Sequence, residues 1–241
     1  IEKRMKRLGL NMQKVKALFV SHEHTDHIKG IPTLAKKYQL PVYITAATLY
    51  HSSLALDKHL VVAFDVNKPV VIGSLAIVAF PKLHDASDPY SFIVTCNKTK
   101  VGVFTDIGEP CKHVINHFKK CHAAFLEANY DDEMLNNGSY PYYLKKRIMG
   151  EKGHLSNKQA LELFQTHRSG FMSHLVLSHL SANNNCPHLV QNLFDENCNG
   201  VKIIVASRYE QTDLYYIKGA DNYKVRSNRI VSASQLSFSF T

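Results

Sequence analysis

Histidines and acidic residues with the spacing of metal ligands stand near the start of the sequence, in the run His22-Glu23-His24-Thr25-Asp26-His27. The apolar residues before this run predict a strand that ends at Ser21. Because alternate residues of a strand share a face, the imidazoles of His22 and His24 would point to the same side and could bind one metal ion. Asp26 and His27 follow where the chain turns into a helix, and they could bind a second ion. This ligand set suits zinc, manganese or iron, and the alternative is a polar surface loop rich in histidine.

Strand-like apolar runs elsewhere in the chain also end in a histidine or a carboxylate. In layered α/β folds the carboxyl ends of the strands gather at one edge of the sheet. Polar side chains from distant parts of the sequence would therefore meet at that edge, as the groups of an active site do. The five runs end at His22, His84, Asp106, Glu127 and His179.

Short apolar runs alternate with amphipathic stretches, and this rhythm predicts a layered fold of the α/β or α+β class. Strands are expected at residues 17–21, 42–45, 70–72, 75–80, 91–95, 101–105, 123–126, 175–178, 201–206 and 214–217. One helix is expected after Asp26, a second after the capping-box pattern of Ser156 and Gln159, and a third from Pro187. No repeat or linker-like stretch divides the chain, so residues 1–241 are expected to form a single domain.

The H-x-H-x-D-H motif after a strand, with His84, Asp106 and His179 at the ends of later strands, resembles the metallo-β-lactamase superfamily. The motifs follow the order of that superfamily over nearly the whole chain. Together they are most similar to its YycJ/WalJ-like branch, a group of bacterial metal-dependent nucleases related to tRNase Z and to the phosphodiesterase PhnP. The segments that carry this resemblance are Ser21-His22 through Gly30, His84-Asp85-Ala86, Phe104-Thr105-Asp106-Ile107-Gly108, Phe125-Leu126-Glu127-Ala128-Asn129, Gly153-His154-Leu155-Ser156 and Leu177-Ser178-His179-Leu180-Ser181.

The resemblance implies a four-layer αββα sandwich of mixed α and β elements, the metallo-β-lactamase fold. Relatives begin with a strand hairpin and an aspartate that supports the metal-binding loop. This sequence opens instead with a basic, helix-like segment, residues 1–8. The hairpin is therefore expected to be absent from this sequence, together with any site residue that it would carry.

Carried over to this sequence, the resemblance assigns ligands for two divalent metal ions, Zn²⁺ or Mn²⁺ with iron as a third option. Three histidines would hold one ion, two histidines and Asp26 the other, and Asp106 would bridge them. A hydroxide shared by the ions would attack phosphorus while both ions stabilise the charge that develops on the phosphoryl oxygens. The first ligand set is His22, His24 and His84, and the second is Asp26, His27 and His179.

A proton donor for the leaving sugar oxygen is expected in the pair Glu127 and His154, since related phosphodiesterases pair a glutamate after a strand with a histidine ahead of a helix. A carboxylate that keeps an imidazolium charged supplies an acid near neutral pH. The alternative is a structural hydrogen bond that positions a metal ligand. Asp26 is expected to act with this pair as a catalytic residue.

A nucleic-acid substrate fits the charge of the chain, which has 29 Lys and Arg residues against 20 Asp and Glu and a net charge of +9. Residues 140–147 place tyrosines that could stack on bases next to basic residues that could meet phosphates, and the alternative is a solvated helix face with core tyrosines. The candidates are Tyr142, Tyr143, Lys145, Lys146 and Arg147. The resemblance implies exonucleolytic cleavage of DNA from 5′ ends. The competing hypotheses are a hydrolase of a cyclic phosphodiester or a thioester, and a non-catalytic binding module that keeps its metals.

The C-terminal residues 233–241 resemble the short peptide by which bacterial replication proteins dock on the sliding clamp, through Gln235, Leu236, Phe238 and Phe240. The alternative is a final edge strand, because serine and phenylalanine alternate there. The 5 scattered cysteines are expected to be reduced thiols in a cytoplasmic protein. No apolar run is long enough to cross a bilayer. His113 and His117, one helical turn apart, could chelate a metal, but a surface helix is the stronger interpretation.

Overall fold

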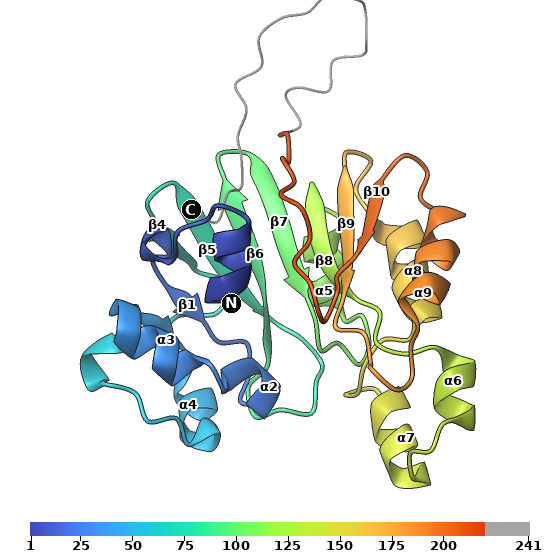
Figure 1. Ribbon diagram of the computed structural model, residues 1–241, viewed down its shortest axis with the longest axis horizontal. Helices are drawn as coiled ribbons and strands as arrows, with labels where there is room; N and C mark the ends of the chain where they lie inside the picture. Colours follow the sequence, from blue (N-terminus) through green and yellow to red (C-terminus); the bar gives the residue numbers. More distant parts are fainter. Residues whose placement is uncertain (220–241) are drawn as a thin grey trace, which may run out of the picture.

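The smaller of two β-sheets contains three parallel strands in the computed structural model, which describes residues 1–219 of the chain (Figure 1). Parallel neighbours need a crossover connection, and α3 (Ile31–Tyr38) and α4 (Ala46–Ser52) lie in the two crossovers. These helices belong to the blue part of the chain in Figure 1. The strands are β1 (Leu18–Phe19), β2 (Val42–Tyr43) and β3 (Val61–Val62).

The larger sheet contains seven strands in the order β10-β9-β8-β7-β6-β5-β4. Strands β4 to β7 pair antiparallel with their neighbours in sequence, whereas β7 to β10 are parallel. Helices α5 (Lys112–Phe118), α8 (Asn157–His167) and α9 (Pro187–Asp195) precede β8, β9 and β10. The strands are β4 (Pro69–Ile72), β5 (Leu75–Pro81), β6 (Tyr90–Cys96), β7 (Thr99–Phe104), β8 (Ala123–Glu127), β9 (His174–Ser178) and β10 (Lys202–Val205).

Three apolar clusters fill the spaces between four layers. Outside the smaller sheet, Ala35 of α3 packs with Val42 of β2. Between the two sheets, Phe19 of β1 meets Phe92 of β6 with the ring centroids 5.7 Å apart. On the other face of the larger sheet, Phe164 of α8 belongs to the largest cluster, which joins α5, α8 and α9 to the strands. The order helix, sheet, sheet, helix confirms the predicted αββα sandwich.

Two helix starts agree with the sequence. The capping box at Ser156 is formed in both directions, because the backbone N–H of Gln159 donates to Ser156 Oγ and that of Ser156 donates to Gln159 Oε1. Helix α9 begins at Pro187, as predicted. The remaining helices and 3₁₀ turns are α1 (Glu2–Arg7), α2 (Thr25–Ile28), α6 (Asp132–Asn137), α7 (Tyr142–Met149), η1 (Met12–Lys14) and η2 (Lys58–Leu60).

Two predictions of secondary structure differ from the structure, and one strand is not predicted. The helix expected after Asp26 is divided at Gly30 into α2 and α3. Residues 214–217 form no strand, so that prediction is wrong. Ile217 is buried and Gly219 lies beside Thr99 at the start of β7, so this segment crosses one face of the larger sheet instead of pairing with an edge (Figure 1). Strand β3 comes from a stretch that the sequence pattern does not mark as a strand.

The described chain begins with α1, and Glu2 in this helix accepts a hydrogen bond from Lys37 Nζ of α3 at 2.8 Å. The first strand that follows is β1. Residues 233–241, which carry the predicted clamp-binding peptide, lie outside the described residues. Within residues 1–219 no helix combines the length and the apolar character that crossing a membrane would need.

Candidate metal centre

The predicted metal ligands follow the carboxyl ends of several strands. His22 and His24 follow β1, and His24 is the residue before α2. His84 follows β5, Asp106 follows β7 and His179 follows β9. Strands β5, β7 and β9 run in one direction, because β5 and β7 are both antiparallel to β6 and β9 joins β7 through the parallel strand β8. Their carboxyl ends therefore lie at the same edge of the sheet.

Three imidazoles form the first ligand group, His22, His24 and His84, whose nitrogen atoms lie within 4.8 Å of one another. His84 Nδ1 faces the carbonyl oxygen of Gly153 at 3.1 Å, so it can donate there and leave the lone pair of Nε2 for a metal. This Nε2 lies 3.2 Å from His24 Nδ1. Two nitrogens bound tetrahedrally to one zinc ion lie about 3.4 Å apart. The separation therefore fits two ligands of one metal ion.

The second ligand group contains Asp26, His27 and His179. Asp26 Oδ2 lies 3.5 Å from His27 Nε2 and 3.7 Å from His179 Nε2. The side chain of Asp26 is 70% exposed, whereas His22 and His84 of the first group are buried. The second group therefore opens to solvent, and a substrate could approach the cluster from this side.

Asp106 lies between the two ligand groups and is buried. Its Oδ1 is 3.8 Å from His84 Nε2 of the first group and 3.3 Å from His179 Nε2 of the second, and its Oδ2 is 3.3 Å from His27 Nε2. Burial raises the pKa of Asp106, but the neighbouring His27 and Lys82 outweigh burial and hold this pKa well below its ordinary value. A charged carboxylate in this position can contact two cations at once.

Buried polar atoms without a hydrogen-bond partner mark the centre of the cluster. Within residues 1–219 they include His22 Nε2, His27 Nε2 and Asp106 Oδ2. Such atoms are costly to bury unless another group satisfies them, and a cation would do so. Burial also lowers the pKa of His22 to about 2 and that of His84 to about 4, so both imidazoles are neutral at pH 7 and keep a lone pair. The donor set therefore fits divalent metal ions.

Glu127 is fully buried beside the cluster, and one of its oxygens contacts two histidines. Oε1 lies 2.8 Å from Nδ1 of His154 and 2.8 Å from Nδ1 of His179, while Oε2 accepts from the backbone N–H of Ile107 at 2.7 Å. Burial raises the pKa of Glu127, but the two imidazoles outweigh burial and lower it. Glu127 is therefore a carboxylate that can orient a predicted metal ligand and His154 at the same time.

His154 lies at the border of the cluster. The centroid of its ring is 5.2 Å from that of His84 and 5.4 Å from that of His179. Asp106, Glu127, His154 and His179 also have the spacing of a ligand group. However, the Nδ1 atoms of both histidines already face Glu127, so this group has fewer free donor atoms than the other two.

Lys82 and Asp85 also belong to this site, although neither is among the predicted site residues. Lys82 Nζ donates to the carbonyl oxygen of Thr105 at 2.7 Å and lies 3.7 Å from Asp106 Oδ2. Burial lowers the pKa of Lys82, and the carboxylate of Asp106 opposes this effect. Asp85 Oδ1 lies 3.5 Å from His84 Nε2. A lysine at the end of an apolar strand, two residues before a predicted ligand, is the sequence signal that could have indicated Lys82.

The tyrosines predicted to stack on bases lie on α7 and point to solvent. Tyr142 is 73% exposed and Tyr143 is 74% exposed. The alternative of core tyrosines is therefore wrong for this pair. Helix α7 projects from the molecule at the lower right of Figure 1.

The three basic residues predicted to meet phosphates are also on α7. Lys145 Nζ donates to the carbonyl oxygen of Asn136. Lys146 Nζ lies 5.5 Å from the centre of the Tyr142 ring on the same helix. Arg147 Nε donates to Asp85 Oδ2. Because Asp85 follows a predicted metal ligand directly, this ion pair connects α7 to the metal centre.

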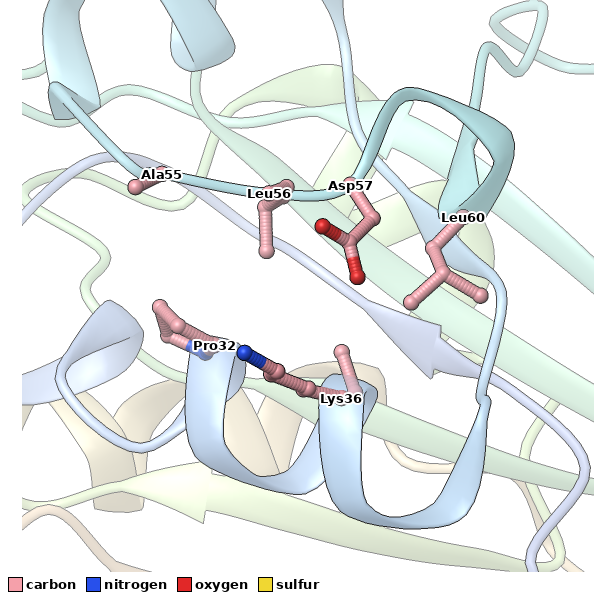
Figure 2. Close-up of a pocket in the computed structure, with 7 residues that line it drawn as sticks. Pro32, Lys36, Ala55, Leu56, Asp57 and Leu60 are labelled. Carbon is pink, nitrogen blue, oxygen red and sulfur yellow. The ribbon is translucent and has the colours of Figure 1, made fainter.

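Two other features lie apart from the cluster. The His117 ring stacks on Phe80 with centroids 4.1 Å apart, and within the described part of the chain neither His113 nor His117 belongs to a group with ligand spacing. A pocket of about 290 Å³ lies between α3 and residues 55–60, where Asp57 and Lys36 line opposite walls (Figure 2). None of the residues that line this pocket belongs to a ligand group.

Comparisons with known proteins agree with this fold. A family model described as a beta-lactamase superfamily domain matches residues 2–180. Exodeoxyribonuclease YycJ of Bacillus anthracis is 33% identical over 191 residues, 77% of this chain and 72% of that protein. Exodeoxyribonuclease WalJ of Streptococcus pneumoniae serotype 2 is 31% identical over 181 residues, and the chain spans 66% of its length. The metallo-beta-lactamase fold protein YhfI of Bacillus subtilis has a TM-score of 0.63 over 81% of this chain and 76% of its own, at 20% identity.

The chain belongs to the beta-lactamase superfamily, and its fold and ligand cluster define a metal-dependent hydrolase that uses divalent ions. Within this superfamily it belongs to the branch that contains YycJ and WalJ. The resemblance seen in the sequence motifs is thereby confirmed.

Proposed function

We propose that the protein is a nuclease that degrades DNA from 5′ ends with the help of two divalent metal ions, Zn²⁺ or Mn²⁺. The observation that carries this proposal is the convergence of two groups of three potential ligands on Asp106. Both sequence relatives named above are exodeoxyribonucleases. The net charge of +9 and the exposed tyrosines and basic residues of α7 support a polyanionic substrate with accessible bases.

Two sets of side chains would hold the ions, with Asp106 shared between them. When bound, the ions would supply an activated water as the nucleophile and positive charge facing the phosphoryl oxygens. Neighbouring groups would hold the ligands in orientation. The Gly153 carbonyl would orient His84, and the Glu127 carboxylate would orient His179. The proposed sets are His22, His24 and His84 for one ion, and Asp26, His27 and His179 for the other.

We assign to His154 the delivery of a proton to the leaving sugar oxygen. Its Nδ1 faces Glu127 Oε1 at 2.8 Å, so the proton available for transfer is on Nε2. The buried carboxylate fixes the orientation of the ring, and a positioned imidazole can act as a general acid. After the transfer, the neutral ring keeps its hydrogen bond to Glu127 and can regain a proton from solvent, because the side chain is 22% exposed.

Asp26 is the most exposed of the proposed ligands, and it lies where a substrate would enter. Its Oδ2 is directed at the two imidazoles of the second ligand group. We propose that its carboxylate also accepts a hydrogen bond from the attacking water and so orients that water toward phosphorus.

The test uses duplex DNA, single-stranded DNA and RNA, each labelled at the 5′ end or the 3′ end, with Mn²⁺ or Zn²⁺. We expect short labelled products from the first 5′ cleavage events on DNA, and no products with Asp106→Ala as the blank. Release from 3′ ends would contradict the proposed polarity. Cleavage of RNA in preference to DNA would contradict the proposed substrate.

A further inference from the structure

We infer that Arg208, Tyr209 and Arg4, here called the β10 rim, form a second substrate-binding surface that holds the DNA strand beside the metal centre. This inference rests on the proposed function. It assigns a role to residues that lie outside the sequence motifs and outside α7. The ligand is a strand with regular negative charges and exposed base faces.

The fold brings the turn after β10 to the edge of the sheet where the ligands lie. Strand β10 pairs parallel with β9 from Lys202 opposite His174 to Val205 opposite Leu177, so both strands end at the same edge. His179 follows β9, and residues 207–210 follow β10. The chain turns back at this point in Figure 1. The two segments are therefore neighbours although they are far apart in the sequence.

A direct hydrogen bond joins the turn to the metal-ligand segment. Arg208 Nη2 donates to the carbonyl oxygen of Leu180 at 2.9 Å. Leu180 is the residue after His179, and consecutive Cα atoms are about 3.8 Å apart. The guanidinium thus lies beside the backbone that follows His179, a residue of the second ligand group.

The turn has a fixed shape that presents its side chains outward. Ser207 Oγ accepts from the backbone N–H groups of Tyr209 and Glu210, each at 3.1 Å. A hydroxyl that caps a turn in this way restrains the backbone. Tyr209 is 81% exposed, so a flat aromatic face is available to a base.

Positive charge from the other end of the described chain joins this turn. Arg4 of α1 donates through Nη2 to the carbonyl oxygen of Arg208. Within residues 1–219 neither guanidinium forms an ion pair with a carboxylate, and Arg208 has one hydrogen bond for its five N–H donors. Two cations that no carboxylate neutralises, beside an exposed ring, match the alternation of phosphates and bases along a strand.

The experiment compares Arg208→Ala and Tyr209→Ala with Lys120→Ala as a control. Lys120 is exposed and precedes β8, at the opposite edge of the sheet, and its loss changes the net charge by the same amount. The measurements are kcat and KM for a 5′-labelled oligonucleotide at several salt concentrations, and the rate with bis(p-nitrophenyl) phosphate, which is too small to reach the rim. Melting temperature and bound metal are recorded for each variant.

We expect Arg208→Ala to raise KM for the oligonucleotide about tenfold and to lower the slope of log KM against log salt by about one, because one phosphate contact is lost. Tyr209→Ala should raise KM about tenfold with the slope unchanged, because stacking carries no charge. Arg208→Lys should keep the slope. Hydrolysis of the small ester should stay within about twofold of the wild type in all variants.

Two results overturn the inference alone. One is cleavage of DNA by the wild type with KM and salt dependence equal in Arg208→Ala and Lys120→Ala. The other is an equal loss of activity on DNA and on the small ester, because Arg208 would then only support the His179 segment. A wild type that hydrolyses the small ester but not DNA overturns the proposed function, and the inference falls with it.

Discussion

One oxygen of Glu127 connects the two kinds of chemistry proposed for this site. Oε1 faces both His154, the proposed acid, and His179, a proposed metal ligand, at the same distance of 2.8 Å. Since Glu127 is fully buried, solvent cannot replace either contact. The orientation of the acid is therefore tied to the orientation of the ligand.

Replacement of His154 by alanine should separate these two roles. We expect kcat on DNA to fall by about 10²-fold to 10⁴-fold, the usual effect of a general acid, with bound metal near the wild-type amount. With bis(p-nitrophenyl) phosphate the loss should be much smaller, because nitrophenolate leaves without a proton. The measurements are steady-state rates on both substrates and metal content by mass spectrometry. An equal loss of bound metal would instead assign His154 to the metal ligands.

Asp106 combines a shared carboxylate with an unusual backbone conformation. Its φ is 56°, and His179 also has a positive φ, of 58°. Non-glycine residues rarely adopt this left-handed region, and asparagine and aspartate tolerate it best. Asp106→Asn therefore tests the role of the carboxylate more directly than Asp106→Ala, because it removes the charge and leaves the backbone preference nearly intact.

We expect Asp106→Asn to bind metal at least tenfold more weakly than the wild type, since changes even in residues that only support ligands commonly cost 10-fold to 100-fold in affinity. Competition with a metal-binding dye measures this. The matched control is Asp65→Asn, which removes an exposed carboxylate far along the chain from any ligand. Unchanged affinity in Asp106→Asn would contradict the bridging role.

At the scale of elements, α8 supports the segment that carries His154. The helix begins directly after its N-cap Ser156, which is two residues beyond this histidine, and Gln159 completes the capping box in the first turn. Ser156→Ala removes the acceptor for the Gln159 N–H, and we expect a loss of about 1 kcal/mol in the free energy of unfolding. Urea denaturation measures it. In a double-mutant cycle with Gln159→Ala the two losses should not add, because both changes disrupt one motif. Strict additivity would mean that the two bonds act independently.

Most strands and the starts of α8 and α9 could be predicted from the sequence. Apolar runs and the patterns at Ser156 and Pro187 involve neighbouring residues only, so they do not depend on the rest of the fold. The wrong strand at residues 214–217 shows the limit of such signals. Its alternation of side chains is real, since Ile217 is buried while Leu214 and Tyr216 are exposed. Within residues 1–219, however, this segment crosses a face of the larger sheet and pairs with no strand. Pairing depends on tertiary placement, which a local pattern does not contain.

The same distinction applies to the site. Each proposed ligand ends an apolar run or lies in the H-x-H-x-D-H motif, so the sequence marks it. Lys82 and Asp85 are part of the site because strand β5 directs one inward and Arg147 holds the other. The place of Lys82 at the end of an apolar run is a local signal, whereas the contact between Asp85 and Arg147 depends on the fold. Arg208 reaches the site only through the parallel pairing of β9 and β10.

For the whole molecule, the ligand cluster joins the two sheets. The motif at residues 22–27 follows β1 of the smaller sheet, while His84, Asp106 and His179 follow strands of the larger one. Bound metal should therefore stabilise the fold as well as the site. At a free metal concentration 100 times Kd, binding to the native state alone contributes about 2.7 kcal/mol. We expect a chelator to lower the melting temperature of the wild type by several degrees and that of Asp106→Asn by about half as much or less, because a tenfold weaker site contributes about 1.4 kcal/mol at the same metal concentration. Equal shifts in both proteins would contradict this coupling.

The metal-free protein should lose stability as the pH falls from 6.5 to 5. Burial lowers the pKa of His22 to about 2 and of His84 to about 4, so in this window the unfolded chain binds protons that the native state does not. The loss is about 2 kcal/mol for each histidine. For His179 burial is outweighed by neighbouring carboxylates, which raise its pKa to about 10, and its contribution is already complete below pH 6.5. Urea denaturation in chelator at both pH values measures the change.

One variant gives the control for this pH dependence. His84→Asn removes one buried imidazole and should make the dependence shallower. The prediction is contradicted if the metal-free wild type is equally stable at pH 6.5 and pH 5.

The distribution of the ligands along the chain has a consequence for biosynthesis. The histidines at positions 22, 24 and 27 leave the ribosome early, whereas His179 emerges only after β9 has been translated. Between these two points the nascent polypeptide carries an incomplete set of the proposed ligands. The full set of proposed ligands can therefore assemble only after His179 has emerged, so a metal ion that needs all of them would be captured late in synthesis or after it.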